Sequence, residues 1–159
     1  MKGKPLFIAL IMMGLLVAGA IPCAVYAQEK APDFSLYDLQ GKPFRLSSYG
    51  KAKAVLLIFG TTWCPSCRSE IPHFKNIYAA YAPKGLEVAY VNIQEPREKA
   101  ARFSAKNQLP YRTLLDLKGD VSMDYNISGV PAMVLIKDGR VVTRTYRLID
   151  GYLEKLFKK

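Results

Sequence analysis

Two cysteines separated by two residues, Cys64 and Cys67 in the segment WCPSC, are the side chains of this sequence best suited to chemistry. Such a pair serves as a redox couple, as half of a zinc site or as a structural disulfide. Zinc needs about four ligands, and His73 is the single histidine of the chain. A disulfide across so short a loop stabilises a fold little, because its effect grows with loop length. The pair therefore favours redox chemistry, with no bound metal or cofactor.

The pattern after the pair predicts which cysteine reacts first. Apolar residues recur at helical spacing from Cys64 onward, so the pair lies at the N-terminus of a predicted helix. Unpaired N–H groups and the helix dipole favour a thiolate at that position, which makes Cys64 the predicted nucleophile. Cys67, one helical turn on, would resolve the mixed disulfide. Pro65 stiffens the turn between them, and Ser66 brings a hydroxyl close to sulfur.

The elements that must hold the pair follow from the same periodicities. Residues 54–59 are a continuous apolar run, which predicts a strand covered on both faces. The helix is predicted over 64–81, with a kink at Pro72 because proline removes one backbone hydrogen bond. Residues 86–93 predict a second buried strand, and 96–107 a second helix. Alternation of strand and helix indicates parallel strands.

The remaining segments complete one α/β domain. Alternation of apolar and polar residues predicts a hairpin at the start of the domain, and Asp138-Gly139 predicts a tight antiparallel hairpin near its end. We expect a mixed central sheet with helices on both faces, in one domain over residues 28–159. The further predicted elements are strands near 31–36, 44–46, 111–115, 132–136 and 141–146, and helices at 120–125 and 150–157.

The first residues predict export. Lys2 and Lys4 precede an uncharged apolar run over 6–21, and Val25-Tyr26-Ala27 suits a signal peptidase site. Residues 1–27 are therefore predicted to be a signal peptide cut after Ala27. An uncleaved membrane anchor and a lipid on Cys23 are the alternatives. All three place the domain outside the cytoplasm, in the cell envelope or periplasm, where disulfides persist.

The charge of the chain argues against one class of partner. The formal net charge is +10, but the Lys and Arg residues are scattered among acidic ones and form no block. Nucleic-acid binding is therefore not expected. A solvated basic surface is the simpler interpretation, and it is compatible with a position near an anionic bilayer.

Several segments together resemble the thioredoxin superfamily, in its TlpA/ResA/CcmG-like branch of extracytoplasmic thiol-disulfide oxidoreductases. The resemblance rests on APDF at residues 31–34, on WCPSC after an apolar strand, on Pro72 and on GVP at residues 129–131. It covers most of residues 31–159. It implies a thioredoxin-like fold with an N-terminal β-hairpin extension, and it implies disulfide exchange in the reductase direction.

The resemblance also implies roles for residues around the pair. Pro131 matches a proline that is cis and lies beside the cysteines, and Val130 before it matches the residue that offers its backbone to an extended substrate. An ordinary trans proline at the start of an edge strand is the alternative. Trp63 is implied to shield the site and contact the substrate, together with Pro65. A tryptophan that simply packs in the core is the alternative.

Glu70 matches an acid that this branch keeps close to the cysteines. A carboxylate there would accept the proton of the resolving thiol, or raise the pKa of the thiols through like charge. The alternative is a surface glutamate paired with Arg68 or Lys75. The buried acid of cytosolic thioredoxins is replaced by Ile58, so Glu70 is the only local candidate for this role.

The implied partners are an exported thiol or disulfide protein, such as an apocytochrome c with its haem-attachment cysteines, and a membrane electron donor that reduces the pair. Two other functions remain open. A peroxiredoxin-like peroxidase fits APDF and the T-x-x-C of residues 61–64, although Leu57 stands where that family has proline. A copper- or thiol-handling chaperone would use the two thiolates as soft metal ligands.

Overall fold

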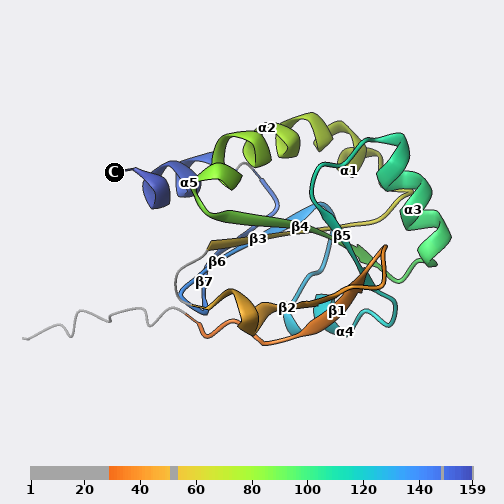
Figure 1. The fold of residues 1–159 in the computed structure, drawn as a ribbon, viewed down its shortest axis with the longest axis horizontal. Helices are drawn as coiled ribbons and strands as arrows, with labels where there is room; N and C mark the ends of the chain where they lie inside the picture. Colours follow the sequence, from red (N-terminus) through yellow and green to blue (C-terminus); the bar gives the residue numbers. More distant parts are fainter. Residues whose placement is uncertain (1–28, 51–53, 148, 159) are drawn as a thin grey trace, which may run out of the picture.

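A single seven-stranded sheet organises the chain. The computed structural model describes residues 29–50, 54–147 and 149–158, so the predicted leader with Cys23 lies outside the described residues. The strand order is β2-β1-β5-β4-β3-β6-β7 (Figure 1). The strands are β1 (Ser35–Asp38), β2 (Pro43–Arg45), β3 (Ala54–Gly60), β4 (Leu86–Ile93), β5 (Arg112–Asp116), β6 (Ala132–Lys137) and β7 (Arg140–Thr145). The helices are α1 (Pro65–Ser69), α2 (Ile71–Tyr81), α3 (Arg97–Lys106), α4 (Asp120–Asp124) and α5 (Asp150–Phe157), with 3-10 turns η1 (Leu46–Tyr49) and η2 (Ala82–Lys84).

The sheet is mixed, as predicted. β3, β4 and β5 are parallel neighbours, whereas β6 and β7 continue one side of the sheet antiparallel and the β1–β2 hairpin continues the other. Crossover helices join the parallel strands, which is what parallel pairing requires. The α/β thioredoxin-like arrangement with an N-terminal hairpin is therefore confirmed.

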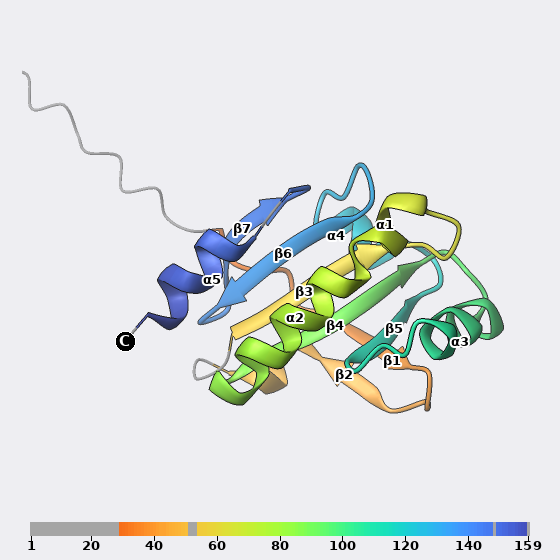
Figure 2. The ribbon, with the colours of Figure 1, turned by 90° about the horizontal axis from the view of Figure 1, so that it is seen from above.

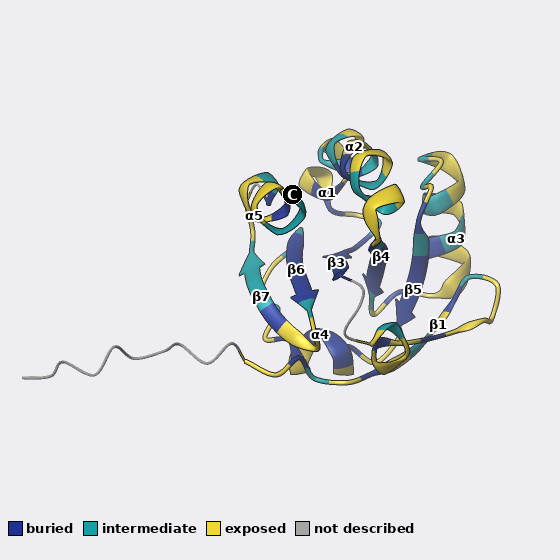
Figure 3. Cartoon of the chain, turned by 60° about the vertical axis from the view of Figure 1, so that its left-hand side comes forward, coloured by how far each residue is buried: buried dark blue, intermediate teal, exposed yellow. Residues whose placement is uncertain are grey.

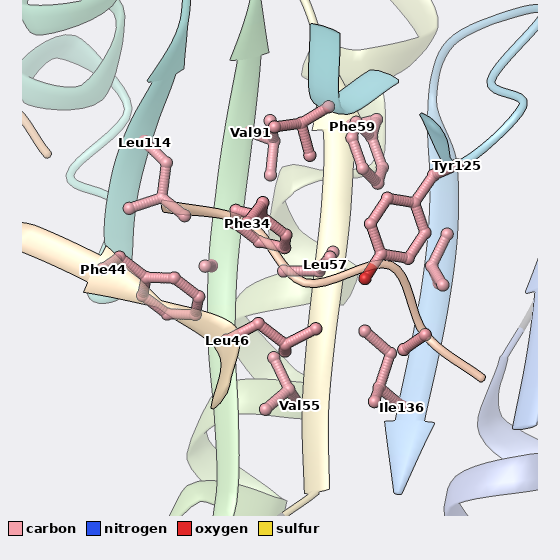
Figure 4. Close-up of a cluster of buried hydrophobic side chains, with 14 of the residues drawn as sticks. Phe34, Phe44, Leu46, Val55, Leu57, Phe59, Val91, Leu114, Tyr125 and Ile136 are labelled. Atoms are coloured by element: carbon pink, nitrogen blue, oxygen red, sulfur yellow. The ribbon is translucent and has the colours of Figure 1, made fainter. Parts of the chain in front are cut away.

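β3 is central because each of its faces meets a different core. Its side chains alternate between the two faces of the sheet. Val55, Leu57 and Phe59 point into the cluster shown in Figure 4. Phe34 from the N-terminal segment and Tyr125 after α4 close this cluster from outside. Leu56 and Ile58 belong to the opposite cluster, so the continuous apolar run is explained by burial on both sides.

The opposite face is covered by α2, α3 and α5, which lie over the sheet in Figure 2. Phe74 of α2, Phe103 of α3 and Leu153 of α5 are buried in that cluster. In Figure 3 the outward sides of these helices are exposed, while the strands beneath them are buried. Within the described ranges, no helix is long and apolar enough to cross a membrane.

The helix predicted over 64–81 is two helices. α1 ends at Ser69, Glu70 lies between, and α2 begins at Ile71. Pro72 has no N–H to donate to the carbonyl of Arg68 and its ring crowds that carbonyl, so the helix cannot continue through this turn. The Glu70 N–H donates to the Ser66 carbonyl at 3.1 Å and completes the last turn of α1. The prediction of a kink at Pro72 was wrong by two residues, and the break falls on Glu70.

The chain enters the domain beside the β6–β7 hairpin. Asp138 and Gly139 have φ values of 54° and 71°, as a two-residue hairpin turn requires. The Ala31 N–H donates to the Gly139 carbonyl at 3.0 Å, and the Val141 N–H donates to the Glu29 carbonyl at 2.8 Å. Because β6 is antiparallel to β3, this turn lies at the end of the sheet opposite the end of β3 that leads to the cysteines.

Candidate redox site

The cysteine pair lies where β3 passes into α1. Cys64 is the N-cap residue of α1, and a disulfide joins it to Cys67 with 5.3 Å between their Cα atoms. The Cys64 Sγ accepts the N–H of Cys67 at 3.1 Å. It also lies 3.2 Å from the Ser66 Oγ, whose hydroxyl is the donor because a disulfide sulfur carries no proton. In the reduced protein the same two donors favour a thiolate at Cys64.

A loop from the start of β6 faces the pair. The Val130–Pro131 peptide is cis, as the resemblance implied. The Val130 carbonyl oxygen lies 3.7 Å from the Cys64 Sγ. Antiparallel pairing aligns Phe59 near the end of β3 with Ala132 at the start of β6. This register brings together two segments that are far apart in the sequence.

Tyr146, just after β7, supports this loop. Its hydroxyl oxygen accepts the backbone N–H of Ser128 at 3.2 Å and lies 3.0 Å from the Ser128 Oγ. These hydrogen bonds with Ser128 lower the pKa of Tyr146 below its usual value. The sequence pattern predicts Tyr146 within a strand and does not reveal this contact, because no local signal couples residue 146 to residue 128.

A hollow of about 560 Å³ opens on the α2 side of the pair. Glu70 lines it, half-buried, so the break between α1 and α2 presents the predicted acid next to Pro131. The alternative pairing of Glu70 with Arg68 or Lys75 does not occur among the described residues. The whole lining is Ser66, Glu70, His73, Pro131, Met133, Tyr146 and Arg147.

A second hollow of about 480 Å³ opens on the other side of Val130. Trp63 and Met123 line it and are exposed by 68% and 65%. Trp63 is therefore not a core residue, and it offers an apolar surface directly before Cys64. Pro65 is also exposed, at the start of α1. Val130 lines the hollow of Trp63, and the next residue, Pro131, lines the hollow of Glu70.

Glu95 is a functional candidate that the sequence patterns did not reveal. It is 6% exposed, and its carboxylate accepts the N–H and the hydroxyl of Thr62, both at 2.6 Å. The amide of Asn92 donates to it at 2.8 Å. The Thr62 carbonyl accepts a hydrogen bond from the Arg68 guanidinium at 3.1 Å. Glu95 and Arg68 thus both bind Thr62 and hold the segment before Trp63 and Cys64. Glu70 is therefore not the only acid near the pair.

A signal for Glu95 was present in the topology. Glu95 follows β4, Thr61 and Thr62 follow β3, and β3 and β4 are parallel. The carboxyl ends of parallel neighbours meet at one edge of a sheet, which is where sites form in α/β folds. For the described residues, no group of three or more His, Cys, Asp or Glu side chains is arranged to hold a metal ion.

The chain is similar to known disulfide-exchange proteins. Residues 27–145 match the AhpC/TSA family. The thiol-disulfide oxidoreductase ResA of Geobacillus kaustophilus is 35% identical over 139 residues, which cover 84% of this chain and 79% of that protein. A crystal structure described as the thiol:disulfide interchange protein DsbE of Chlorobium tepidum superposes with a TM-score of 0.72 at 31% identity, covering 80% of this chain and 92% of that one.

A third similar protein is a secreted disulfide oxidoreductase of Mycobacterium tuberculosis, homologous to E. coli DsbE. It superposes with a TM-score of 0.64 at 27% identity, covering 73% of this chain and 84% of that one. The relatives and the Cys64–Cys67 disulfide agree on the chemistry. The chain belongs to the AhpC/TSA family with a thioredoxin-like fold, and it is a thiol-disulfide oxidoreductase related to ResA.

Proposed function

We propose that the protein acts outside the cytoplasm and reduces disulfides of exported proteins. The observation that carries this proposal is the Cys64 sulfur, which accepts the Cys67 N–H and faces the Val130 carbonyl across 3.7 Å. Similarity to a secreted disulfide oxidoreductase supports the location, as does the apolar leader. Apocytochrome c, with its pair of haem-attachment cysteines, is the proposed substrate.

The proposed reaction uses the two cysteines in sequence. The Cys64 thiolate attacks one sulfur of the substrate disulfide, forms a mixed disulfide and releases the other substrate sulfur as a thiolate, which takes up a proton. Cys67 then loses its proton and attacks the Cys64 sulfur. The second substrate thiol leaves, and the Cys64–Cys67 disulfide remains. Two electrons have passed to the substrate, and a membrane electron donor returns them.

The surroundings of the pair have separate roles in this proposal. Val130 and Pro131 dock the substrate backbone, while Trp63 and Pro65 contact its side chains. Glu70 receives the proton of Cys67, since it is half-buried in the adjoining hollow. Without a nearby acceptor, a buried thiol is slow to become the thiolate that attacks.

A trapping experiment tests the proposal. The Cys67→Ala variant, expressed in the native cell, is expected to accumulate mixed disulfides between Cys64 and exported proteins, which mass spectrometry identifies. The Cys64→Ala variant is the matched control and should trap none. A measured reduction potential of the pair decides the direction, and a value more oxidising than that of the trapped substrates would overturn the reductase role. Peroxide consumption that survives the loss of Cys67 would indicate a peroxidase instead.

A further inference from the structure

Four basic side chains gather in one groove next to the redox pair. The groove has a volume of about 510 Å³ and lies between α1 and α3. We call it the basic groove. Its lining is Thr62, Arg68, Lys99, Arg102, Phe103, Lys106 and Asn107. Three of the cations lie three and four residues apart on α3 and the fourth is Arg68, so no continuous basic block in the sequence signals this cluster.

One wall of the basic groove is a face of α3. Lys99, Arg102 and Lys106 follow one another at spacings of three and four residues, which places them on the same side of a helix. All three are exposed. No carboxylate in the described part of the chain forms an ion pair with any of them. Their charges therefore act together on whatever enters the groove.

The other wall belongs to the redox site. Arg68 directly follows Cys67, and its guanidinium is held over the loop by the Thr62 carbonyl. Thr62 is two residues before Cys64. An anionic chain in the basic groove therefore lies against the segment that carries the disulfide. Figure 1 shows α1 and α3 as neighbours at the same end of the sheet.

We propose that the basic groove docks an acidic segment of the protein that exchanges its disulfide with Cys64. The proposal rests on the function proposed above and adds the charge of the partner. Carboxylates are the complementary groups for unpaired cations, and such complementarity mainly raises the rate of encounter. The occupant is a polypeptide and not an anionic bilayer, because Thr62 and Arg68 in the groove wall flank Cys64 and Cys67, where the exchanging protein must bring its own sulfur.

Three disulfide peptides of equal length test the proposal. They share one cysteine core, and their flanks carry four glutamates, four glutamines or four lysines. With the reduced full chain at low salt, the glutamate peptide is expected to be reduced about tenfold faster than the glutamine peptide, and the lysine peptide slower. The advantage should fall in strong salt, because exposed charges are screened.

Two double variants locate the effect. Lys99→Gln with Arg102→Gln should remove the advantage of the glutamate peptide and leave the rate of the glutamine peptide unchanged. Lys155→Gln with Lys158→Gln removes the same charge from the far end of α5 and should keep the advantage. If both variants lose the rate advantage of the glutamate peptide equally, the net charge of the protein and not the groove attracts the peptide, and the proposal is wrong. The proposal is also wrong if the three peptides react equally in the unaltered chain.

Failure of the exchange reaction itself is a separate outcome. If no peptide is reduced, the proposed function fails. The groove is then judged by binding of the glutamate peptide to the Cys64→Ala, Cys67→Ala chain, measured by fluorescence anisotropy. Binding that depends on Lys99 and Arg102 supports the groove, and its absence overturns it. Anionic vesicles that bind through the same two residues, while the peptides do not, would assign the groove to lipid and overturn the proposal.

Discussion

Truncation of Glu95 to alanine is expected to lower both the stability of the protein and the reactivity of Cys64. Glu95 is 6% exposed, and its carboxylate accepts three hydrogen bonds, two from Thr62 and one from Asn92. A hydrogen bond to a charged group contributes about 1.5–3 kcal/mol. Thr62 is half-buried, so water replaces part of what it loses. The net loss should be about 3 kcal/mol, most of it from donors left unpaired.

Glu95→Gln separates geometry from charge. With its amide oxygen in place of Oε2, glutamine accepts from the Thr62 N–H and from Asn92, and its NH2 group donates to the Thr62 hydroxyl. All three contacts remain, so the free energy of unfolding should fall by less than about 1 kcal/mol. Urea unfolding of the oxidised protein measures the free energy of unfolding of both variants. The rate of peptide disulfide reduction measures the reactivity of Cys64.

The control for this prediction is Glu98→Ala, which removes the same charge from the exposed surface of α3. It should change the free energy of unfolding by less than about 0.5 kcal/mol. Equal destabilisation by Glu95→Ala and Glu95→Gln would refute the reasoning, since the charge and not the hydrogen bonds would then hold the loop. A loss below about 1 kcal/mol in Glu95→Ala would refute it as well.

Two further predictions concern stability. Burial raises the pKa of Tyr90, Tyr111 and Tyr125 above the usual value of 10.0, so the free energy of unfolding should fall as pH rises beyond about 10, by up to 1.4 kcal/mol per pH unit for each tyrosine. Urea titrations at several pH values measure this slope. Tyr111→Phe should make it shallower, and an unchanged slope would contradict the assignment. Gly60→Ala would place a Cβ against the Tyr90 hydroxyl oxygen and 2.7 Å from the Tyr90 Cζ, and it should cost about 1–3 kcal/mol. Tyr90→Phe should recover part of that loss, and a purely additive double variant would argue against the clash.

Local patterns were sufficient for the elements of the sheet and for the reactive pair. The apolar run of β3 predicted burial on both faces, since each face of a central strand meets its own core. Asp138-Gly139 predicted its hairpin because both residues tolerate positive φ. The position of Cys64 at a helix start followed from the periodicity of the residues after it.

Contacts between distant segments were beyond those patterns. Periodicity assigns Lys99 and Arg102 to one side of a helix, but it does not say that Arg68 lies across from them. It likewise does not show that Glu95 is buried under the loop at Thr62, because a glutamate after a strand is usually solvated. The sequence predicted the helix break at Pro72, whereas the structure has it at Glu70. A proline disrupts the hydrogen bonds of the turn that precedes it.

The chain enters the domain beside the β6–β7 turn, and this position would determine the orientation of the domain on a membrane. The seven residues of β3, at about 3.3 Å per residue, separate that turn from the disulfide by about 20 Å. If the predicted leader is retained as an anchor, the described chain begins at Glu29 beside this turn, at the end of the sheet opposite Cys64. We then expect the proposed membrane electron donor to reach the disulfide with an exported domain of its own. A donor whose thiols lie at the lipid surface would face the end of the sheet opposite the disulfide.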